Sequence, residues 1–323
     1  MNSSKSSSEA TELEIGPYAV RISNPDRVYF PARGETKLDL ANYYLSVADG
    51  IVRALRERPC MLHRFPTGVS GEKVHQKRLP HGAPPWVETV RVEFPRYQRH
   101  AYELCVTDIA QVVWAVQMST VEFHPWNSRR ADTEKPDEWR IDLDPMPECD
   151  FDTVRKVAAV AHEVLDELGA TGWPKTSGGS GLHIYVRIRP EHGFTDVRRG
   201  ALAFAREVER RIPDLATTTW WRKDRDPKKL FIDFNQNARD HTIAAAYSVR
   251  GNPEATVSAP LRWDEIEDAL PADFTIATMP SRFAAVGDLH DGIDEAVFGI
   301  EPLLQWAERD EQEGAETPPE PES

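Results

Sequence analysis

Apolar and polar residues alternate along several short stretches of the chain, which is the pattern of strands buried on one face. Residues 139–145 read Trp-Arg-Ile-Asp-Leu-Asp-Pro. Because successive strand side chains point to opposite faces, Ile141 and Leu143 share one face, and Asp142 and Asp144 share the other. The proline that follows ends the strand and leaves both acids at its rim. Other strands are expected at residues 18–30 with a turn, 89–94, 103–107, 121–124, 170–175, 182–188 and 230–234.

Apolar residues recur with the 3.6-residue helical period in other stretches, most clearly over residues 154–168. Asp150 or Asp152 can cap the start of this helix, and Gly169 can cap its end. The link between the strands at 170–175 and 182–188 is too short for a parallel crossover, so these strands should pair antiparallel. Further helices are expected at residues 39–55, 109–119 and 196–212.

The two ends of the chain differ in composition from the middle. Residues 1–12 are polar and Ser-rich, and residues 308–323 are acidic and Pro-rich, so both are expected to be disordered tails. No low-complexity linker interrupts the chain between them, which predicts one continuous domain over residues 13–307.

The formal charge of -14 is unevenly distributed. Residues 261–323 hold 17 acids and 3 bases, whereas the preceding residues hold 36 of each. Residues 51–100 carry ten Lys or Arg against four acids, and this local basic surface suits phosphate binding, although a solvated face would look the same. Arg64, Lys77 and Arg78 are the candidate DNA-binding residues of this segment.

Cysteine usage and hydropathy restrict the class of protein. Cys60, Cys105 and Cys149 lie far apart and form no Cys-x-x-Cys pair, which argues against disulfides and against a structural zinc site. No run of some 18 apolar residues occurs, and the first residues lack the apolar segment of a signal peptide. We therefore expect a cytoplasmic protein with no membrane partner.

Carboxylates form the first candidate site. Asp142 and Asp144 repel each other unless a cation lies between them, and Mg²⁺ or Mn²⁺ favours such oxygen ligands, although two solvated acids at a strand end are an alternative. Asp233 lies inside an apolar strand, where an unpaired carboxylate costs several kcal/mol. It is therefore either a third metal ligand or the partner of a base such as Lys228 or Lys229.

A Gly-rich loop forms the second candidate site. Ser177, Gly178, Gly179, Ser180 and Gly181 offer backbone amides and hydroxyl groups that suit an anionic phosphate, although such a loop can also be a simple turn. The chain contains neither Gly-x-x-x-x-Gly-Lys-Ser nor Gly-x-Gly-x-x-Gly, so the ordinary ATPase and dinucleotide-binding classes lose support. The next strand places the side chains of His183, Tyr185 and Arg187 on one polar face.

Five motifs together resemble a known family. They are Val-Glu-Phe-His-Pro-Trp (121–126), Ile-Asp-Leu-Asp-Pro (141–145), Lys-Thr-Ser-Gly-Gly-Ser-Gly-Leu-His (175–183), Leu-Phe-Ile-Asp-Phe-Asn-Gln-Asn (230–237) and Ala-Tyr-Ser-Val-Arg (246–250). Their order and spacing resemble the polymerase domain of bacterial ligase D, within the archaeo-eukaryotic primase superfamily, over roughly residues 18–300.

This resemblance implies an α+β (mixed α/β) fold with mostly antiparallel sheets, an RRM-like catalytic core and flanking helices. It also implies a primase-polymerase, a nucleotidyltransferase that uses two divalent ions, Mn²⁺ or Mg²⁺. Asp142, Asp144 and Asp233 would be the catalytic metal ligands. The nucleotide site would comprise His124, Ser177, Gly178, Gly179, Ser180, His183, Gln236 and Arg250. Without the resemblance, His124 could equally be a strand-end histidine, Gln236 a surface amide and Arg250 a solvated cation.

Arg27 and Lys37 match positions that bind the 5′-phosphate of a downstream strand in that family, although both could simply be exposed cations. The resemblance thus implies repair synthesis at short gaps or ends, with ribonucleoside triphosphates used in preference. The implied partners are 5′-phosphorylated DNA, nucleoside triphosphates, a separate ligase and other repair proteins. A monomer in the bacterial cytoplasm, associated with the nucleoid, is expected.

Three departures from the family pattern limit this carry-over. Ser180 replaces a Lys in the phosphate loop, Val74 and His75 replace an aromatic pair, and His63 stands where Lys is common. The Lys-x-Asp-Gly ligase motif is absent, so a stand-alone polymerase is expected. Two other classes stay open: a metal-dependent phosphoesterase or nuclease, and a non-catalytic DNA-end-binding module.

Overall fold

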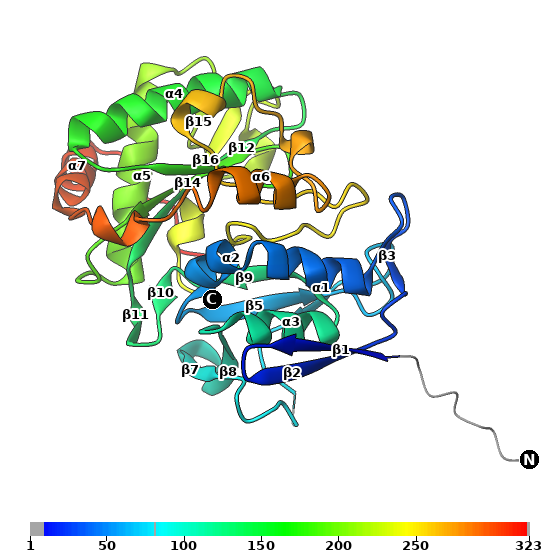
Figure 1. Cartoon of the computed structure of the whole chain (residues 1–323). Helices are drawn as coiled ribbons and strands as arrows, with labels where there is room; N and C mark the ends of the chain where they lie inside the picture. The colour runs from blue at the N-terminus through cyan, green and yellow to red at the C-terminus, as the bar shows by residue number, and fades with distance from the viewer. Residues whose placement is uncertain (1–9, 81, 322–323) are drawn as a thin grey trace, which may run out of the picture.

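The computed structural model describes residues 10–80 and 82–321, which build two five-stranded sheets with helices packed against them (Figure 1). The first sheet comes from residues 59–125 and the second from residues 138–233. Mixed helices and mostly antiparallel strands agree with the expected fold class. All three cysteines are free, and Cys60 and Cys105 are buried.

The first sheet has the order β6-β5-β8-β7, with β9 on the other side of β5. Its strands are β5 (Pro59–Arg64), β6 (Val74–Gln76), β7 (Thr89–Phe94), β8 (Arg99–Cys105) and β9 (Thr120–Pro125). Helices α1 (Lys37–Ser46), α2 (Ala48–Leu55) and α3 (Ile109–Gln117) accompany it. Asp108 caps α3 with a side-chain bond to the Ala110 amide, 2.7 Å long.

The second sheet has the order β13-β14-β12-β16-β15. Its strands are β12 (Glu138–Pro145), β13 (Trp173–Thr176), β14 (Leu182–Arg187), β15 (Ala216–Thr217) and β16 (Leu230–Asp233), and only β15 and β16 run parallel. Helices α4 (Phe151–Leu168) and α5 (Phe194–Arg211) pack on it, and α7 (Glu301–Gln312) packs on α5 (Figure 1). As expected, Asp150 caps α4 at its start and Gly169 ends it with φ 69°.

Smaller elements complete the chain. The two-stranded sheets are β1 (Ala10–Ile15) with β2 (Tyr18–Ser23), β3 (Val28–Phe30) with β4 (Glu35–Thr36), and β10 (Ser128–Arg129) with β11 (Asp132–Pro136). In the described part of the chain, the remaining α-helix is α6 (Met279–Val286), and six short 3-10 turns occur, including η3 (Phe234–Asn237) after β16. Over residues 10–80 and 82–321, no helix is both long and apolar enough to cross a bilayer.

The element predictions were incomplete, since α6, α7 and several short strands were not predicted, and two further differences have a clear physical cause. The helix expected at 39–55 is divided at Val47, whose φ of -116° is not helical; this side chain is fully buried, so the apolar pattern runs through the break without marking it. Strand β5 was not predicted because residues on both of its faces are buried, which removes the alternation.

The chain ends also differ from the expected tails. Residues 1–9 of the expected N-terminal tail lie outside the described residues, while residues 10–12 belong to β1. At the other end, the expected domain boundary at residue 307 falls inside α7. The acidic segment beyond α7 lies along α5, where Arg198 donates to the carbonyl oxygens of Pro318 and Pro319 at 3.3 and 2.9 Å.

Strand register decides which side chains meet at the centre of the second sheet. Asp142 of β12 lies directly opposite His183 of β14 on one side and Asp233 of β16 on the other. Beyond Asp233 the chain leaves the sheet, and the Asn237 side chain takes the place of a strand. Its Oδ1 accepts from the Arg140 amide at 2.8 Å, and its Nδ2 donates to the Arg140 carbonyl at 2.7 Å.

Replacing Asn237 with Ala should therefore leave two buried backbone groups of Arg140 without partners. We expect Asn237→Ala to lower the free energy of unfolding by about 2–4 kcal/mol, because each unsatisfied buried group costs about 1–3 kcal/mol. Denaturant titration measures this loss. Asn42→Ala, on the exposed face of α1, is the control and should change stability by less than about 0.5 kcal/mol. Equal stability of the two variants would contradict the role given to Asn237.

Candidate functional site

A cavity of ≈ 320 Å³ lies where the two sheets meet and gathers most of the predicted site residues. Strand β9 contributes His124, β12 contributes both of its acids, and β14 contributes His183. The complete lining is His124, Asp142, Leu143, Asp144, Ser177, Gly179, Ser180, Gly181, His183, Thr242, Ile243, Ala244 and Arg250. Asp142, Asp144 and most of the phosphate loop therefore face one common space, whereas Asp233 is not in the lining and lies beside Asp142 on the next strand.

The three predicted metal ligands lie on adjacent strands. Asp142 and Asp233 face each other across β12 and β16, and Asp144 extends from the same face of β12. Burial raises the pKa of Asp142 to about 7, against the charges of Lys175 and Arg250. Desolvation in the cleft and the neighbouring charges of Asp142 and Asp233 raise the pKa of Asp144 to about 6, and burial beside Asp142 also raises that of Asp233.

This crowding of acids is the property expected of a divalent metal site. Asp233 accepts hydrogen bonds from the Asn235 amide at 2.9 Å and from Gln236 Nε2 at 3.0 Å. Lys229 Nζ instead donates to the Pro213 carbonyl. Within the described residues, no ion pair joins Asp233 to Lys228, to Lys229 or to a nearby Arg, although the charge of Asp233 acts on Arg225. An all-oxygen set of mutually repelling carboxylates fits Mn²⁺ or Mg²⁺.

Lys175 is a buried residue that the sequence pattern did not single out. Its ammonium group bonds to His183 Nδ1 at 2.7 Å, to the Ala244 carbonyl and to Ser258 Oγ. His183 Nε2 in turn lies 3.3 Å from Asp142 Oδ1. Because an ionised carboxylate only accepts hydrogen bonds, a proton on His183 Nε2 would be donated to Asp142, which leaves Nδ1 to accept from Lys175. Lys175 thus orients the histidine that holds a candidate metal ligand.

The phosphate loop is organised around Ser177. Its Oγ accepts from the amides of Gly179 and Gly181 at 3.0 and 3.1 Å, so these two amides are not free for a phosphate as the sequence suggested. Gly178 has φ 72°, and a Cβ there would lie 2.5 Å from Arg250 Cγ. Arg250 can therefore pack over the loop, where its Nη1 donates to the Ser177 carbonyl at 2.7 Å.

His124 belongs to a buried cluster that the sequence showed only in part. Glu122, two residues earlier on the same face of β9, lies between His124 and His63 of β5. Ligand atoms of these three side chains lie within 4.8 Å of one another. Gln236 is not part of the cavity lining; it donates to Asp233 at 3.0 Å.

The predicted 5′-phosphate residues lie close together but differ in exposure. Lys37 is only 4% exposed, so a simple surface position is wrong. Its Nζ donates to the Ser23 carbonyl at 3.0 Å and to Gln117 Oε1 at 2.7 Å. Burial, followed by the charge of Arg27, lowers the pKa of Lys37 to about 8. Arg27 is exposed and donates to the Pro66 carbonyl at 2.7 Å.

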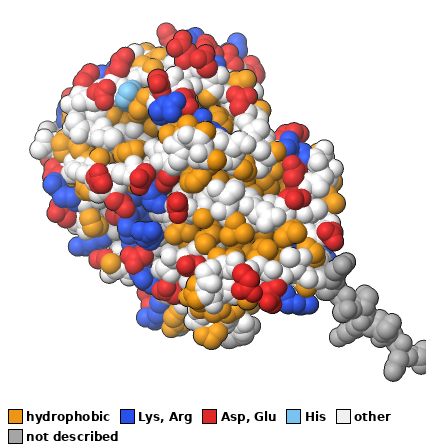
Figure 2. All heavy atoms as spheres, viewed as in Figure 1, with side chains coloured by type: hydrophobic (Ala, Val, Ile, Leu, Met, Phe, Trp, Pro, Cys, Tyr) orange, Lys and Arg blue, Asp and Glu red, His pale blue; other side chains and the backbone are white. Residues whose placement is uncertain are grey.

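The other predicted DNA-binding residues already have protein partners. Arg64 donates to the Met118 carbonyl and to Gln76, and Arg78 donates to the His100 carbonyl at 2.7 Å. Lys77 forms an ion pair with Asp240, with 2.7 Å between Nζ and Oδ1. On the face in Figure 2, Lys and Arg side chains lie among Asp and Glu side chains and do not form one continuous basic surface.

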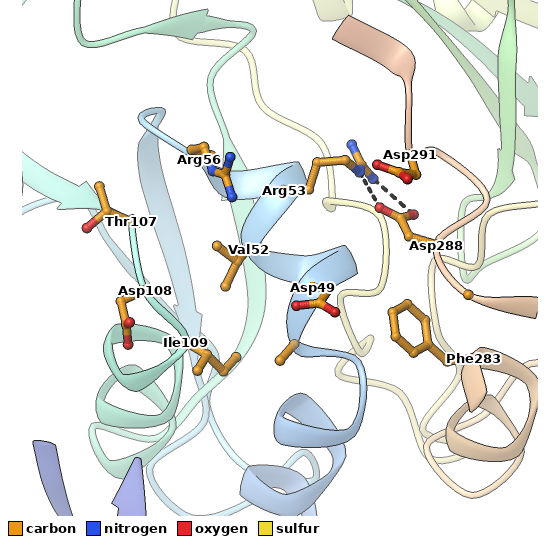
Figure 3. A pocket seen from close by; sticks show the side chains of 12 residues that line it. Asp49, Val52, Arg53, Arg56, Thr107, Asp108, Ile109, Phe283, Asp288 and Asp291 are labelled. Atoms are coloured by element: carbon orange, nitrogen blue, oxygen red, sulfur yellow. Dashed lines mark hydrogen bonds and ion pairs between the residues drawn. The ribbon is translucent and has the colours of Figure 1, made fainter. Parts of the chain in front are cut away.

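A larger cavity of ≈ 580 Å³ lies away from the predicted site residues, between α2, the start of α3 and residues 283–291. Its lining mixes acids with Arg53 and Arg56, and Figure 3 shows the ion pair from Arg53 to Asp288 at its edge. Since Tyr247 also donates to Asp288 at 2.8 Å, this edge connects α2 to the C-terminal half.

Comparison with known proteins identifies the family. The sequence pattern described as "LigD, primase-polymerase domain" matches residues 36–290. The chain belongs to this family. It is 34% identical over 264 residues to "Multifunctional non-homologous end joining protein LigD" of Pseudomonas aeruginosa, covering 81% of this chain and 31% of that protein. The protein with the same description from Mycolicibacterium smegmatis is 33% identical over 280 residues, covering 85% of this chain and 36% of that protein.

A solved structure also matches. It is the "Polymerase Domain from Mycobacterium tuberculosis Ligase D in complex with DNA", with TM-score 0.79 and 29% identity, over 85% of this chain and 98% of the other. The fold class and the resemblance to ligase D-type primase-polymerases, a class of nucleotidyltransferase, are thus confirmed. The chain spans about a third of the length of the LigD relatives from Pseudomonas and Mycolicibacterium.

The crowded acids predict an unusual dependence of stability on pH. The Asp142 carboxyl has a pKa of about 7 in the folded protein against 3.8 in an unfolded chain, so folding stability falls as pH rises between these values. Without divalent ions, Asp142→Asn should therefore stabilise the protein at pH 8 by on the order of 2–4 kcal/mol, and by less at pH 5.

Thermal unfolding in EDTA over pH 5–8 measures this difference, with the exposed Asp214→Asn as a control that should show none. Mn²⁺ should remove the advantage of Asp142→Asn by stabilising the wild type through binding. A wild type that is as stable as the variant at pH 8 without metal would count against mutual repulsion in the site.

Proposed function

We propose that this protein is a metal-dependent polymerase that adds nucleotides from triphosphates to a DNA 3′-hydroxyl during repair. The observation that carries this proposal is the meeting of three desolvated carboxylates, Asp142, Asp144 and Asp233, beside the Ser177–Gly181 loop and Arg250. Family membership supports a polymerase over a nuclease or a non-catalytic DNA-end-binding module.

One group of residues would bind the metal ions, and another would bind the triphosphate. The three acids would hold two divalent ions, and His183, oriented by Lys175, would keep Asp142 in place. When bound, such ions lower the pKa of the attacking hydroxyl and neutralise charge on the triphosphate and leaving pyrophosphate. Arg250, His124 and the Ser177 loop would bind the triphosphate, and Ser180 supplies only a hydroxyl there.

Repair of DNA ends is the proposed setting. The named relatives are non-homologous end joining proteins, and the matched polymerase domain was solved with DNA. For this chain we propose synthesis at short gaps or ends that carry a downstream 5′-phosphate, with ribonucleotides used in preference and Mn²⁺ as the favoured ion. A separate ligase would then seal the product.

Extension of a labelled primer-template with Mn²⁺ tests the polymerase directly. Ala at Asp142, Asp144 or Asp233 should lower the rate by more than about a hundredfold, since even groups that only support metal ligands contribute about 10 to 100-fold. Asp214→Ala is the matched control. Competition between ribonucleotides and deoxynucleotides at equal concentration measures the preference for one sugar over the other. Wild-type-like extension by Asp233→Ala would end the three-ligand proposal, and cleavage of the primer would favour a nuclease.

The preferred DNA can be tested through Arg27 and Lys37. A charge-assisted phosphate contact contributes about 1.5–3 kcal/mol, so a 5′-phosphate should speed filling of a one-to-three nucleotide gap by roughly tenfold or more. The Arg27→Ala, Lys37→Ala double variant should lose this advantage. Arg33→Ala, an exposed cation beside the same turn, should retain it. If the phosphate does not change the wild-type rate, the gap-filling assignment is wrong.

A further inference from the structure

Three imidazole rings stack in a row from the surface to the candidate nucleotide site. His75 of β6 and His63 of β5 are cross-strand partners with ring centres 4.4 Å apart. His63 stacks on His124 of β9 with 3.7 Å between ring centres and an angle of 26° between ring planes. His75 is exposed, whereas His63 and His124 are buried and His124 lines the cavity.

Glu122 holds the two inner rings. Its Oε2 lies 3.0 Å from His63 Nδ1 and 2.8 Å from His124 Nε2, and its Oε1 accepts from the Gly251 amide at 2.8 Å. Although burial opposes its ionisation, the hydrogen bonds from the histidines and the charge of Arg250 hold the pKa of Glu122 well below its usual range. Glu122 is therefore a carboxylate that only accepts hydrogen bonds.

The carboxylate fixes where each ring carries its proton. His63 must donate from Nδ1 and His124 from Nε2, so a neutral ring leaves a bare lone pair on the other nitrogen. Both of those atoms, His63 Nε2 and His124 Nδ1, are buried and have no hydrogen-bond partner. Burial lowers the pKa of His63 and lowers that of His124 to about 3, so both rings are neutral at pH 7 when the site is empty.

A cation does not suit this cluster. Two imidazoles bound to one metal at about 2.1 Å point toward a single atom, which places their ring centres roughly 5 Å apart. The rings of His63 and His124 stack at 3.7 Å, and the Arg250 guanidinium lies 3.5 Å from Glu122 Oε2. The arrangement is therefore suited to gaining a proton near an anion.

We propose that triphosphate binding takes up one proton on the His63–His124 pair, which makes nucleotide affinity depend on pH. This rests on the proposed nucleotide site. Arg250 is the one fixed cation in the described lining of the cavity, which it shares with Asp142 and Asp144. A triphosphate would stabilise a ring charge close to it, and a proton at His124 Nδ1 or His63 Nε2 leaves both bonds to Glu122 intact. Stacked rings repel when both are charged, so the pair shares one proton.

The other ionisable groups around the pair do not reproduce this effect. Lys73 and His75 act on His63, while Arg250 and Glu122 act on His124. Across the cavity, Asp142 and Asp144 lose protons when a metal binds, and His183 is held by Lys175. If Mn²⁺ saturates the protein before nucleotide is added, the acids stay ionised. The proton uptake measured on adding nucleotide then comes from the histidines.

The direction of the pH dependence follows from the change in the pKa of the His63–His124 pair. The pair has a low pKa in the empty protein and a higher pKa in the complex, so the complex binds more protons. Affinity should fall as pH rises toward 8, with the KM for nucleotide rising up to about tenfold per pH unit. The value of kcat should change less, because the proton assists binding.

The test is titration calorimetry of MnATP into the full chain at saturating Mn²⁺, in buffers of different ionisation heat, with KM measured over pH 6–8. For each ATP bound, the wild type should take up about one proton more than the double variant His63→Asn, His124→Asn. His63→Lys, which supplies a fixed charge, should lower the uptake to less than half and flatten the KM profile. His162→Asn, a histidine stacked on Trp263 outside the cavity, is the matched control.

The outcomes separate this proposal from the one on which it rests. ATP binding with equal proton uptake in the wild type and the double Asn variant would overturn the proton-linked pair alone, as would an unchanged KM slope in His63→Lys. If His63→Lys does not fold, the double variant still decides. No binding of ATP to the wild type would instead overturn the nucleotide site itself.

Discussion

Mutual repulsion among three carboxylates is the constraint on which the rest of the structure depends. Asp142, Asp144 and Asp233 meet because β12 and β16 pair in one register, and a slip of one residue would turn the acids of β12 to the other face. The fold opposes the repulsion with rigid neighbours. Asn237 continues the β16 side of the sheet by bonding to the Arg140 backbone, and His183 anchors Asp142 from β14. The acids are thus held close together, and their mutual repulsion favours the binding of cations between them.

The same sheet carries buried cations as well as the acids, among them Arg140, Lys175 and Arg187. Lys175 is fully buried and bonds to His183, Ala244 and Ser258, so the orientation of the histidine beside the candidate metal ligand Asp142 depends on a buried lysine. Its pKa lies well below the usual range because of burial and the charge of Arg250. A buried ammonium group is costly, and the three hydrogen bonds of Lys175 replace only part of the lost hydration.

The candidate site draws on both sheets, and their charges complement each other. The second sheet supplies the acids and the Gly-rich loop, whereas the first supplies His124 with Glu122 and His63 behind it. The carboxylates of the second sheet therefore concentrate negative charge at the site, and the first sheet offers histidines that can become positive. Binding of metal would release protons from the first group, and binding of triphosphate would add one to the second, so the two ligands have opposite proton linkage.

The sequence by itself determined the elements and the chemistry that local pattern can encode. Alternation fixed the shared face of Asp142 and Asp144, and the helical period with its capping residues fixed α4. The apolar strand around Asp233 predicted a third metal ligand, because a buried carboxylate is costly unless it is paired or bound to a metal. Strand β5 escaped detection because burial on both faces removes the alternation, and the break at Val47 escaped because a buried residue continues the apolar pattern.

Only the tertiary structure decided which distant residues meet. Glu122 gave no local sign of holding His63, which is 59 residues away, since cross-strand pairing and not sequence spacing brings them together. Lys37 likewise reads as an exposed cation, yet the fold buries it against Ser23 and Gln117. The physical reason is the same in both cases. The periodicity of side chains along the sequence shows only which residues share a face of one helix or strand. The burial, pKa and hydrogen-bond partners of a residue depend on the other elements that pack against that face.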